Sequence, residues 1–193
     1  MEVKVGPAHY STKFSGNKRQ KVLTTDTFQY IPIEETLSQL LQMSDIRKEI
    51  ECFHGSKDNV LRDMCDGSIC KSHPQFSTDK NTIQIIGYFD EIELCNPLGS
   101  SNKKHKLGCI FFSIGNLRPQ FRSWLRCIFV VSMVSAVVIR KHGMNSFLQP
   151  FVDSMKMLSS EGLTVSINGK NTHFKVGLLS MLAQSWGTCH RRI

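Results

Sequence analysis

The chain has 193 residues, of which 40% are hydrophobic, 21% charged and 9% aromatic. This balance is typical of a globular domain and excludes collagen-like, fibrous and wholly disordered classes. The formal net charge of +8 is unevenly distributed, because residues 1–22 carry +4, residues 23–100 carry −7 and residues 101–193 carry +11.

The excess of basic residues in the second half of the chain coincides with a long stretch that has no acidic residue. From Leu94 to Val152 the sequence contains no Asp or Glu. A block of this kind suits a polyanion, and DNA is the simplest partner. The same charge also fits a solvated basic face without a partner. The residues predicted to contact nucleic acid are Lys103, Lys104, Lys106, Arg118, Arg122 and Arg126.

Cysteine usage and apolar runs indicate the compartment. The seven cysteines are an odd number at irregular spacing, as expected for reduced thiols. The first thirty residues contain no apolar stretch of signal-peptide length. The longest apolar run, Cys127 to Ile139, is shorter than the roughly 20 residues of a membrane span. We therefore expect an intracellular protein of the nucleus or cytoplasm, neither secreted nor bound to a membrane.

The N-terminal part divides into two predicted segments. Residues 1–22 mix Lys, Gly, Ser and Pro without hydrophobic periodicity, which predicts a flexible basic arm. Residues 23–81 are predicted to form a helical extension, with one or two amphipathic helices over 33–52 and a short helix from Ser56 to Met64.

The remaining sequence alternates strand and helix patterns. Strands are predicted at 82–90, at 107–115 and from Cys127 onward, followed by a helix at 145–160. A hairpin is predicted around Asn168-Gly169, and the run 178–183 fits either a strand or a helix. These elements predict an α/β domain over 82–184, with an irregular tail at 185–193.

Two patterns suggest metal chemistry. Asp90 ends a buried β-rich run, where a carboxylate is displayed on a rigid strand and can hold Mg²⁺ or Mn²⁺ for phosphoryl transfer. An Asp at the end of a strand is also an ordinary turn residue that bonds its own backbone. A second cluster contains donors for zinc, but its spacings match no standard zinc finger. The residues of this cluster are Cys52, His54, Cys65, Cys70 and His73. No glycine-rich phosphate loop is present, and nothing indicates a small-molecule substrate.

Four segments together carry a resemblance to a known family. They are IQIIGYFDEIELCNPLG (83–99), HKLGCIFFSIGNLRPQFRS (105–123), FLQPFVDSMKMLSSEGLTV (147–165) and FKVGLLSMLAQ (174–184). Over roughly residues 33–184 the chain resembles transposase-like proteins of CACTA (EnSpm-type) DNA transposons. The resemblance implies a partial RNase H-like mixed sheet, with Asp90 as the first catalytic acid and a ligand of Mg²⁺ or Mn²⁺.

The chain also departs from the family pattern. The resemblance places a second acid just after residues 178–183, where this sequence has Gln184, and a third acid beyond Ile193. One carboxylate does not hold two divalent ions, so we expect a truncated, transposase-derived protein without strand cleavage of its own. One alternative is a non-enzymatic basic module that binds nucleic acid through the arm of residues 1–22 and the block 103–141. The other is a protein-interaction fragment that self-associates through unpaired strand edges.

Overall fold

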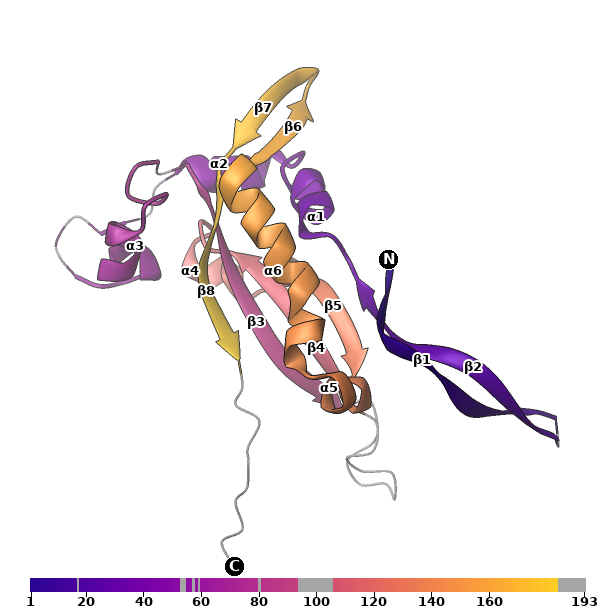
Figure 1. Cartoon of the computed structure of the whole chain (residues 1–193). Coiled ribbons are helices and arrows are strands. Elements are labelled where there is room, and N and C mark those ends of the chain that lie inside the picture. Colours follow the sequence, from indigo (N-terminus) through magenta and orange to yellow (C-terminus); the bar gives the residue numbers. More distant parts are fainter. Residues whose placement is uncertain are drawn as a thin grey trace, which may run out of the picture.

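The computed structural model describes residues 1–16, 18–52, 55–56, 58, 60–79, 81–93 and 106–183. Within them, six strands form one mixed sheet in the order β1-β2-β5-β4-β3-β8, and two more strands form a separate hairpin (Figure 1). The predicted α/β class with a mixed sheet is confirmed. The sheet consists of β1 (Glu2–Ser15), β2 (Lys18–Tyr30), β3 (Ile83–Glu93), β4 (Lys106–Ile114), β5 (Phe129–Ser135) and β8 (Val176–Ala183), and the hairpin of β6 (Leu163–Ile167) and β7 (Lys170–Phe174).

Strand β3 pairs on both sides within the sheet. It pairs antiparallel with β4 and parallel with β8, and β4 in turn pairs antiparallel with β5. The isoleucine-rich start of β3 lies between β4 and β8, and its side chains are buried on both faces of the sheet. The side chain of Asn116, just after β4, fixes this start by accepting from the backbone of Gln84 at 2.7 Å and donating to the carbonyl of Thr82 at 3.0 Å.

One face of the sheet is covered by the crossover between β5 and β8. Two helices, α5 (Ala136–His142) and α6 (Met144–Glu161), lie in this connection, and α6 runs along the sheet (Figure 1). Its buried side chains recur at helical spacing, and Phe147 contacts Phe28 of β2 and Phe89 of β3 in edge-to-face geometry. The predicted helix at 145–160 and the strand at the start of 127–139 are both confirmed.

Short helices precede β3 and connect β4 to β5. The predicted helices over 33–52 are α1 (Ile33–Leu40) and α2 (Ser44–Glu51). Between Ser56 and Met64 the described residues form no helix, contrary to prediction. The first described helical turn after α2 begins at Met64, and the side chain of Asp63 caps its N-terminus. The remaining short helices are η1 (Met64–Asp66), α3 (Ser68–Ser72), α4 (Pro119–Arg122) and η2 (Leu125–Cys127).

The largest difference from prediction is at the N-terminus. Residues 1–22 were predicted to be a flexible basic arm and residues 23–81 a helical extension. Instead, β1 and β2, which ends at Tyr30, form a hairpin that projects from the edge of the sheet (Figure 1). The hairpin is anchored because Gln29 and Tyr30 pair with β5. Its outer part has few buried side chains, so a search for hydrophobic periodicity finds no signal there.

Two further predictions concern the C-terminal part. The run 178–183, which fitted either a strand or a helix, lies within strand β8. The predicted hairpin around Asn168-Gly169 is confirmed as β6–β7. The predicted tail, residues 185–193, lies outside the described residues. No helix in the described part of the chain is long and apolar enough to cross a membrane.

Candidate functional site

Asp90 lies near the end of β3, on the sheet face opposite α6. Side chains alternate along a strand, and the preceding Phe89 contacts Phe147 of α6. The Asp90 side chain is exposed, and its Oδ1 accepts a hydrogen bond from the backbone N–H of Glu91 at 2.8 Å. This is the local bond that a strand-ending Asp makes to its own backbone. The carboxylate still has an open side toward solvent.

The neighbours of Asp90 do not complete a metal site among the described residues. Its cross-strand partner is Cys109, a buried thiol whose pKa is raised by burial and, secondarily, by the charge of Asp90. Glu91 points to the other face of the sheet by strand alternation, where its carboxylate is 3.0 Å from the ammonium of Lys106. The described residues contain no group of three His, Cys, Asp or Glu side chains arranged to hold an ion. Asp90 alone does not fit Mg²⁺ or Mn²⁺ catalysis.

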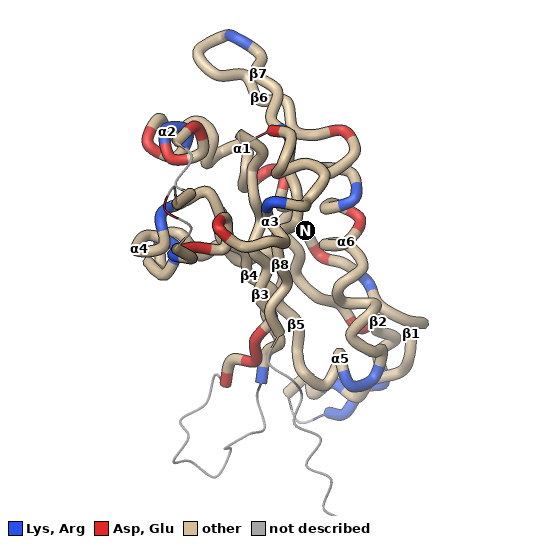
Figure 2. The backbone as a smooth tube through the Cα atoms, turned by 90° about the vertical axis from the view of Figure 1, so that its left-hand side faces the viewer, with Lys and Arg blue, Asp and Glu red and all other residues tan. Residues whose placement is uncertain are grey.

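Three of the six predicted nucleic-acid contacts are ion-paired within the molecule. Besides Lys106, these are Arg118 and Arg122; Figure 2 shows acidic and basic residues side by side where β3 ends and β4 begins. Arg118 lies 2.7 Å from the carboxylate of Glu49 on α2. Lys103 and Lys104 lie outside the described residues.

Arg122 is largely buried and connects two segments of the fold. Its guanidinium pairs with the carboxylate of Asp63, and its Nε donates to the carbonyl of Leu117 at 2.6 Å. The side chains of Arg122 and Asp63 are only 11% and 9% exposed. A phosphate has little access to this guanidinium, so the contact joins residues 60–66 to the turn after β4.

Arg118 and Arg126 line a cleft of about 870 Å³ between α2 and the segment from α4 to η2. The guanidinium of Arg126 stacks over the ring of Trp124 at 4.1 Å from its centroid, and that of Arg118 over Phe121 at 4.8 Å. The opposite wall carries the carboxylates of Asp45 and Glu49. The cleft therefore brings two predicted arginines together with aromatic rings, but its acidic wall opposes a polyanion.

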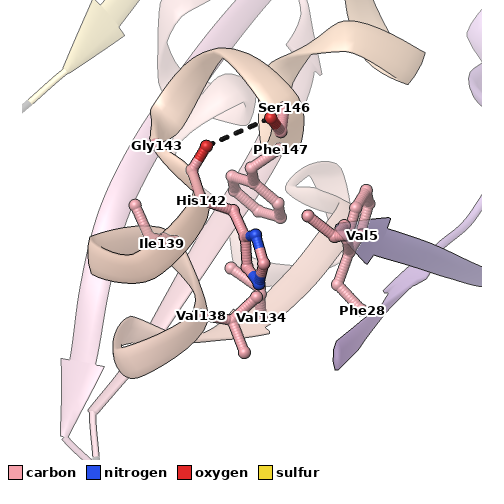
Figure 3. Close-up of a pocket in the computed structure, with 9 residues that line it drawn as sticks. All are labelled: Val5, Phe28, Val134, Val138, Ile139, His142, Gly143, Ser146 and Phe147. Carbon is pink, nitrogen blue, oxygen red and sulfur yellow. Dashed lines mark hydrogen bonds between the residues drawn. The ribbon is translucent and has the colours of Figure 1, made fainter. Parts of the chain in front are cut away.

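A second cluster of charges joins the β1–β2 hairpin to α5. Asp26 of β2 accepts from Lys141 at 2.5 Å and lies 2.8 Å from the ring Nε2 of His142. These hydrogen bonds lower the pKa of Asp26 to about 2. The ring of His142 packs beside Val5 and Phe28 of the hairpin, in a junction that leaves no space for a water molecule (Figure 3). The hairpin is thus fixed at its base.

The outer hairpin is rich in exposed cations. The arm of residues 1–22 was predicted to be part of the alternative basic module, but none of its residues was singled out. Lys13, Lys18 and Lys21 are exposed there, and Arg19 lies over the ring of Phe14, 5.3 Å from its centroid. The β-branched and aromatic residues of 22–30 and the Gly16-Asn17 pair between them and residues 2–15 are a hairpin signal in the sequence.

Of the cysteine and histidine cluster considered for zinc, Cys65 and Cys70 lie together beside Gln84, but the described residues provide no third His, Cys, Asp or Glu side chain that would complete a metal site with them. Cys65 donates to the side-chain Oε1 of Gln84 at 3.2 Å, and Cys70 is buried. Burial raises the pKa of the Cys70 thiol to about 12. Cys52 is exposed, and His54 lies outside the described residues. Cys70 is therefore a buried packing group, whereas Cys65 is partly exposed.

Comparison with known proteins gives no further assignment. No family model, no curated protein and no solved structure matches the chain.

Proposed function

We propose that the chain is a transposase-derived protein with a partial RNase H-like domain, which binds DNA and does not cleave it by itself. The observation that carries the proposal is the topology around Asp90. Strands β3, β4 and β5 form an antiparallel meander, and β8 returns through α5 and α6 to lie parallel to β3. RNase H-like domains begin with this order of strands, and their first acid lies on the central strand, as Asp90 does.

The register of β8 supports the same proposal. The last described pair of the parallel ladder is Phe89 with Ala183, so the ladder reaches the residue before Asp90. The family resemblance places the second acid just after this segment of β8. At that position the sequence has Gln184, which lies outside the described residues. An amide in place of a carboxylate removes the charge on which divalent-ion binding depends.

DNA is the proposed partner because the chain is basic and its sequence resembles transposase-like proteins. Binding that relies on Lys and Arg contacts to phosphates falls steeply with salt. We expect the purified chain to bind a duplex in fluorescence anisotropy, with affinity that drops as KCl is raised. We expect no nicking of supercoiled plasmid in the presence of Mg²⁺ or Mn²⁺.

Two results would contradict this proposal. If the chain binds no duplex even at low salt, DNA is not its partner. If plasmid is nicked with Mn²⁺ and the nicking disappears in Asp90→Asn, the chain is an active nuclease. Asp90→Asn is nearly isosteric and lies at an exposed position, so loss of folding would not explain such a result.

A protein-interaction role is the second candidate, and the edge of the sheet favours it. Strand β8 is an edge strand among the described residues, and Met181 and Leu182 near its end are 36% and 52% exposed. Exposed apolar edges pair readily with another chain. Sedimentation of the free protein tests this role, because self-association through β8 would weaken when Leu182 is replaced by Lys.

A further inference from the structure

The outer β1–β2 hairpin is a two-stranded ribbon that stands clear of the domain. Beyond the contacts of Asp26 and His9 with α5, the pairing continues without interruption through six residue pairs, from Tyr10↔Leu23 to Ser15↔Lys18. At about 3.3 Å per residue the part beyond His9 is roughly 20 Å long. Figure 1 shows this ribbon extending away from the sheet.

The charge of the ribbon has one sign. No carboxylate occurs from Val3 to Thr25, a stretch that contains four lysines and Arg19. The two carboxylates that flank this stretch, Glu2 and Asp26, lie at the base of the hairpin, where Asp26 is held by Lys141 and His142. Lys13, Lys18 and Lys21 are exposed and make no ion pair with any described residue. Their positive charge is therefore available to a partner, unlike that of Lys106, Arg118 and Arg122.

The two faces of the ribbon differ in chemistry but are both basic. Residues opposite each other in an antiparallel pair point to the same face. One face carries Tyr10, Phe14 and Leu23 with Arg19 and Lys21, and the other carries Lys13 and Lys18. Tyr10 and Phe14 are 73% and 67% exposed. A flat polyanion would contact the cations of one face, whereas a partner that surrounds the ribbon contacts both.

We propose that this ribbon enters the major groove of duplex DNA. The major groove of B-DNA, about 12 Å wide, admits a two-stranded β-ribbon and is bordered by phosphates on both sides. Lysines on both faces then reach the two phosphate backbones, while the aromatic face lies against base edges and thymine methyl groups. The major groove of RNA duplexes is too deep and narrow for this contact. The inference rests on the proposed function, since it names the element through which the chain contacts DNA.

The experiment compares two triple variants with the same charge change. The ribbon variant is Lys13→Gln, Lys18→Gln and Lys21→Gln, and the control is Lys71→Gln, Lys156→Gln and Lys170→Gln, all at exposed lysines. Anisotropy titrations use a mixed-sequence duplex and one of its single strands over a range of KCl. Circular dichroism verifies that both variants keep the fold, which is expected because none of these six lysines makes an ion pair with a described residue.

The ribbon variant is expected to bind duplex at least about tenfold more weakly than the wild type at low salt. Its plot of log affinity against log salt should be shallower by about 3 units, because each lost phosphate contact contributes roughly 0.9. The control should lose much less affinity and keep the slope. The wild type, but not the ribbon variant, should protect guanine N7 atoms from dimethyl sulfate, since N7 lies in the major groove.

Contrary outcomes separate the inference from the proposed function. Equal loss of affinity in both variants, or wild-type binding without N7 protection, overturns the ribbon's role and leaves DNA binding standing. Tighter binding of the single strand than of the duplex also overturns it, because the aromatic face then acts as a stacking platform. If the wild type binds no DNA and the ribbon variant changes only sedimentation, the ribbon is a protein contact and both proposals fail.

Discussion

The ring Nε2 of His142 lies 2.8 Å from the Oδ2 of Asp26, so helix α5 is joined to the β1–β2 hairpin by a charged hydrogen-bonded contact. Lys141 binds the same carboxylate oxygen at 2.5 Å, and His9 of β1 lies 3.8 Å from the other. Three basic groups from two elements thus surround one carboxylate that is 21% exposed. This cluster fixes the direction in which the ribbon projects.

Replacing Asp26 with Asn should destabilise the protein at neutral pH by on the order of 1–2 kcal/mol, after allowance for solvent screening. The pKa of Asp26 is lowered from 3.8 to about 2. A lowered carboxyl pKa contributes stability that is present above the unfolded-state pKa and is lost as pH falls through the folded-state value. The difference in unfolding free energy between wild type and Asp26→Asn should therefore shrink between about pH 4 and pH 2. Urea unfolding at a series of pH values measures it, and a difference that is constant with pH would contradict the assignment.

Gly6→Ala should undock the base of the hairpin. Gly6 has φ +71°, a conformation that disfavours L side chains, and an added Cβ would meet the ring of His142. Hydrogen exchange should become faster in the hairpin, while the amides of β3 and β4 keep their protection. Gly16→Ala is the matched control, because Gly16 also has a positive φ, +58°, but its Cβ would meet no atom. Equal effects of the two changes would show that strain alone, and not the contact with His142, is responsible.

Arg122→Ala should destabilise the fold far more than Arg118→Ala. Removing one partner of a buried ion pair leaves the other charge uncompensated and costs about 3 kcal/mol or more, whereas an exposed pair contributes about 1 kcal/mol or less. Arg122 is 11% exposed and bonds Asp63 and the Leu117 carbonyl, whereas Arg118 is 46% exposed. Equilibrium unfolding in urea gives both values. Similar costs for the two changes would argue against a structural role for Arg122.

Cys52 should react with iodoacetamide before Cys70 and Cys109. The thiolate is the reactive form, and burial raises the pKa of Cys70 to about 12 and also raises that of Cys109. Cys52 is exposed at the end of α2. Mass spectrometry of peptides after brief alkylation at pH 8 orders the three sites. Rapid labelling of Cys70 in the folded protein would contradict its burial beside Gln84.

The sequence predicted the elements with strong periodicity. The run that forms β3, the helix α6 and the Asn-Gly hairpin were all found, because each has a complete local pattern of apolar or turn residues. The β1–β2 hairpin was missed because most of its outer side chains face solvent, so no apolar periodicity marks it. The placement of β8 beside β3 is a contact between segments about ninety residues apart, which local patterns do not encode.

The sequence shows the uneven distribution of charge, but it does not show which of the basic side chains are neutralised in the folded protein. Residues 94–152 contain no carboxylate, but carboxylates from other parts of the chain form ion pairs with basic residues of this block. Glu91 pairs with Lys106, Glu49 with Arg118, and Asp63 with Arg122. A segment count cannot find such pairs, because the partners meet only in the folded chain. Among the described residues, the cations left without acidic partners include the lysines of the ribbon.

The most direct test of the proposed function is to introduce a carboxylate at position 184, where the family resemblance expects the second acid. In a partial RNase H-like sheet, Gln184→Asp should create a site for Mn²⁺ that the wild type lacks. At a Mn²⁺ concentration of about ten times the dissociation constant, binding should stabilise the folded protein by about 1.4 kcal/mol, which raises Tm by roughly 3–6 °C. The control is the double variant Gln184→Asp, Asp90→Asn.

We expect Mn²⁺ to raise the Tm of Gln184→Asp and to leave the Tm of the wild type and of the double variant unchanged. If Gln184→Asp responds to Mn²⁺ no more than the wild type, or if the response persists without Asp90, the two positions do not form the acid pair of an RNase H-like domain. The proposed descent from a transposase would then lose its structural basis.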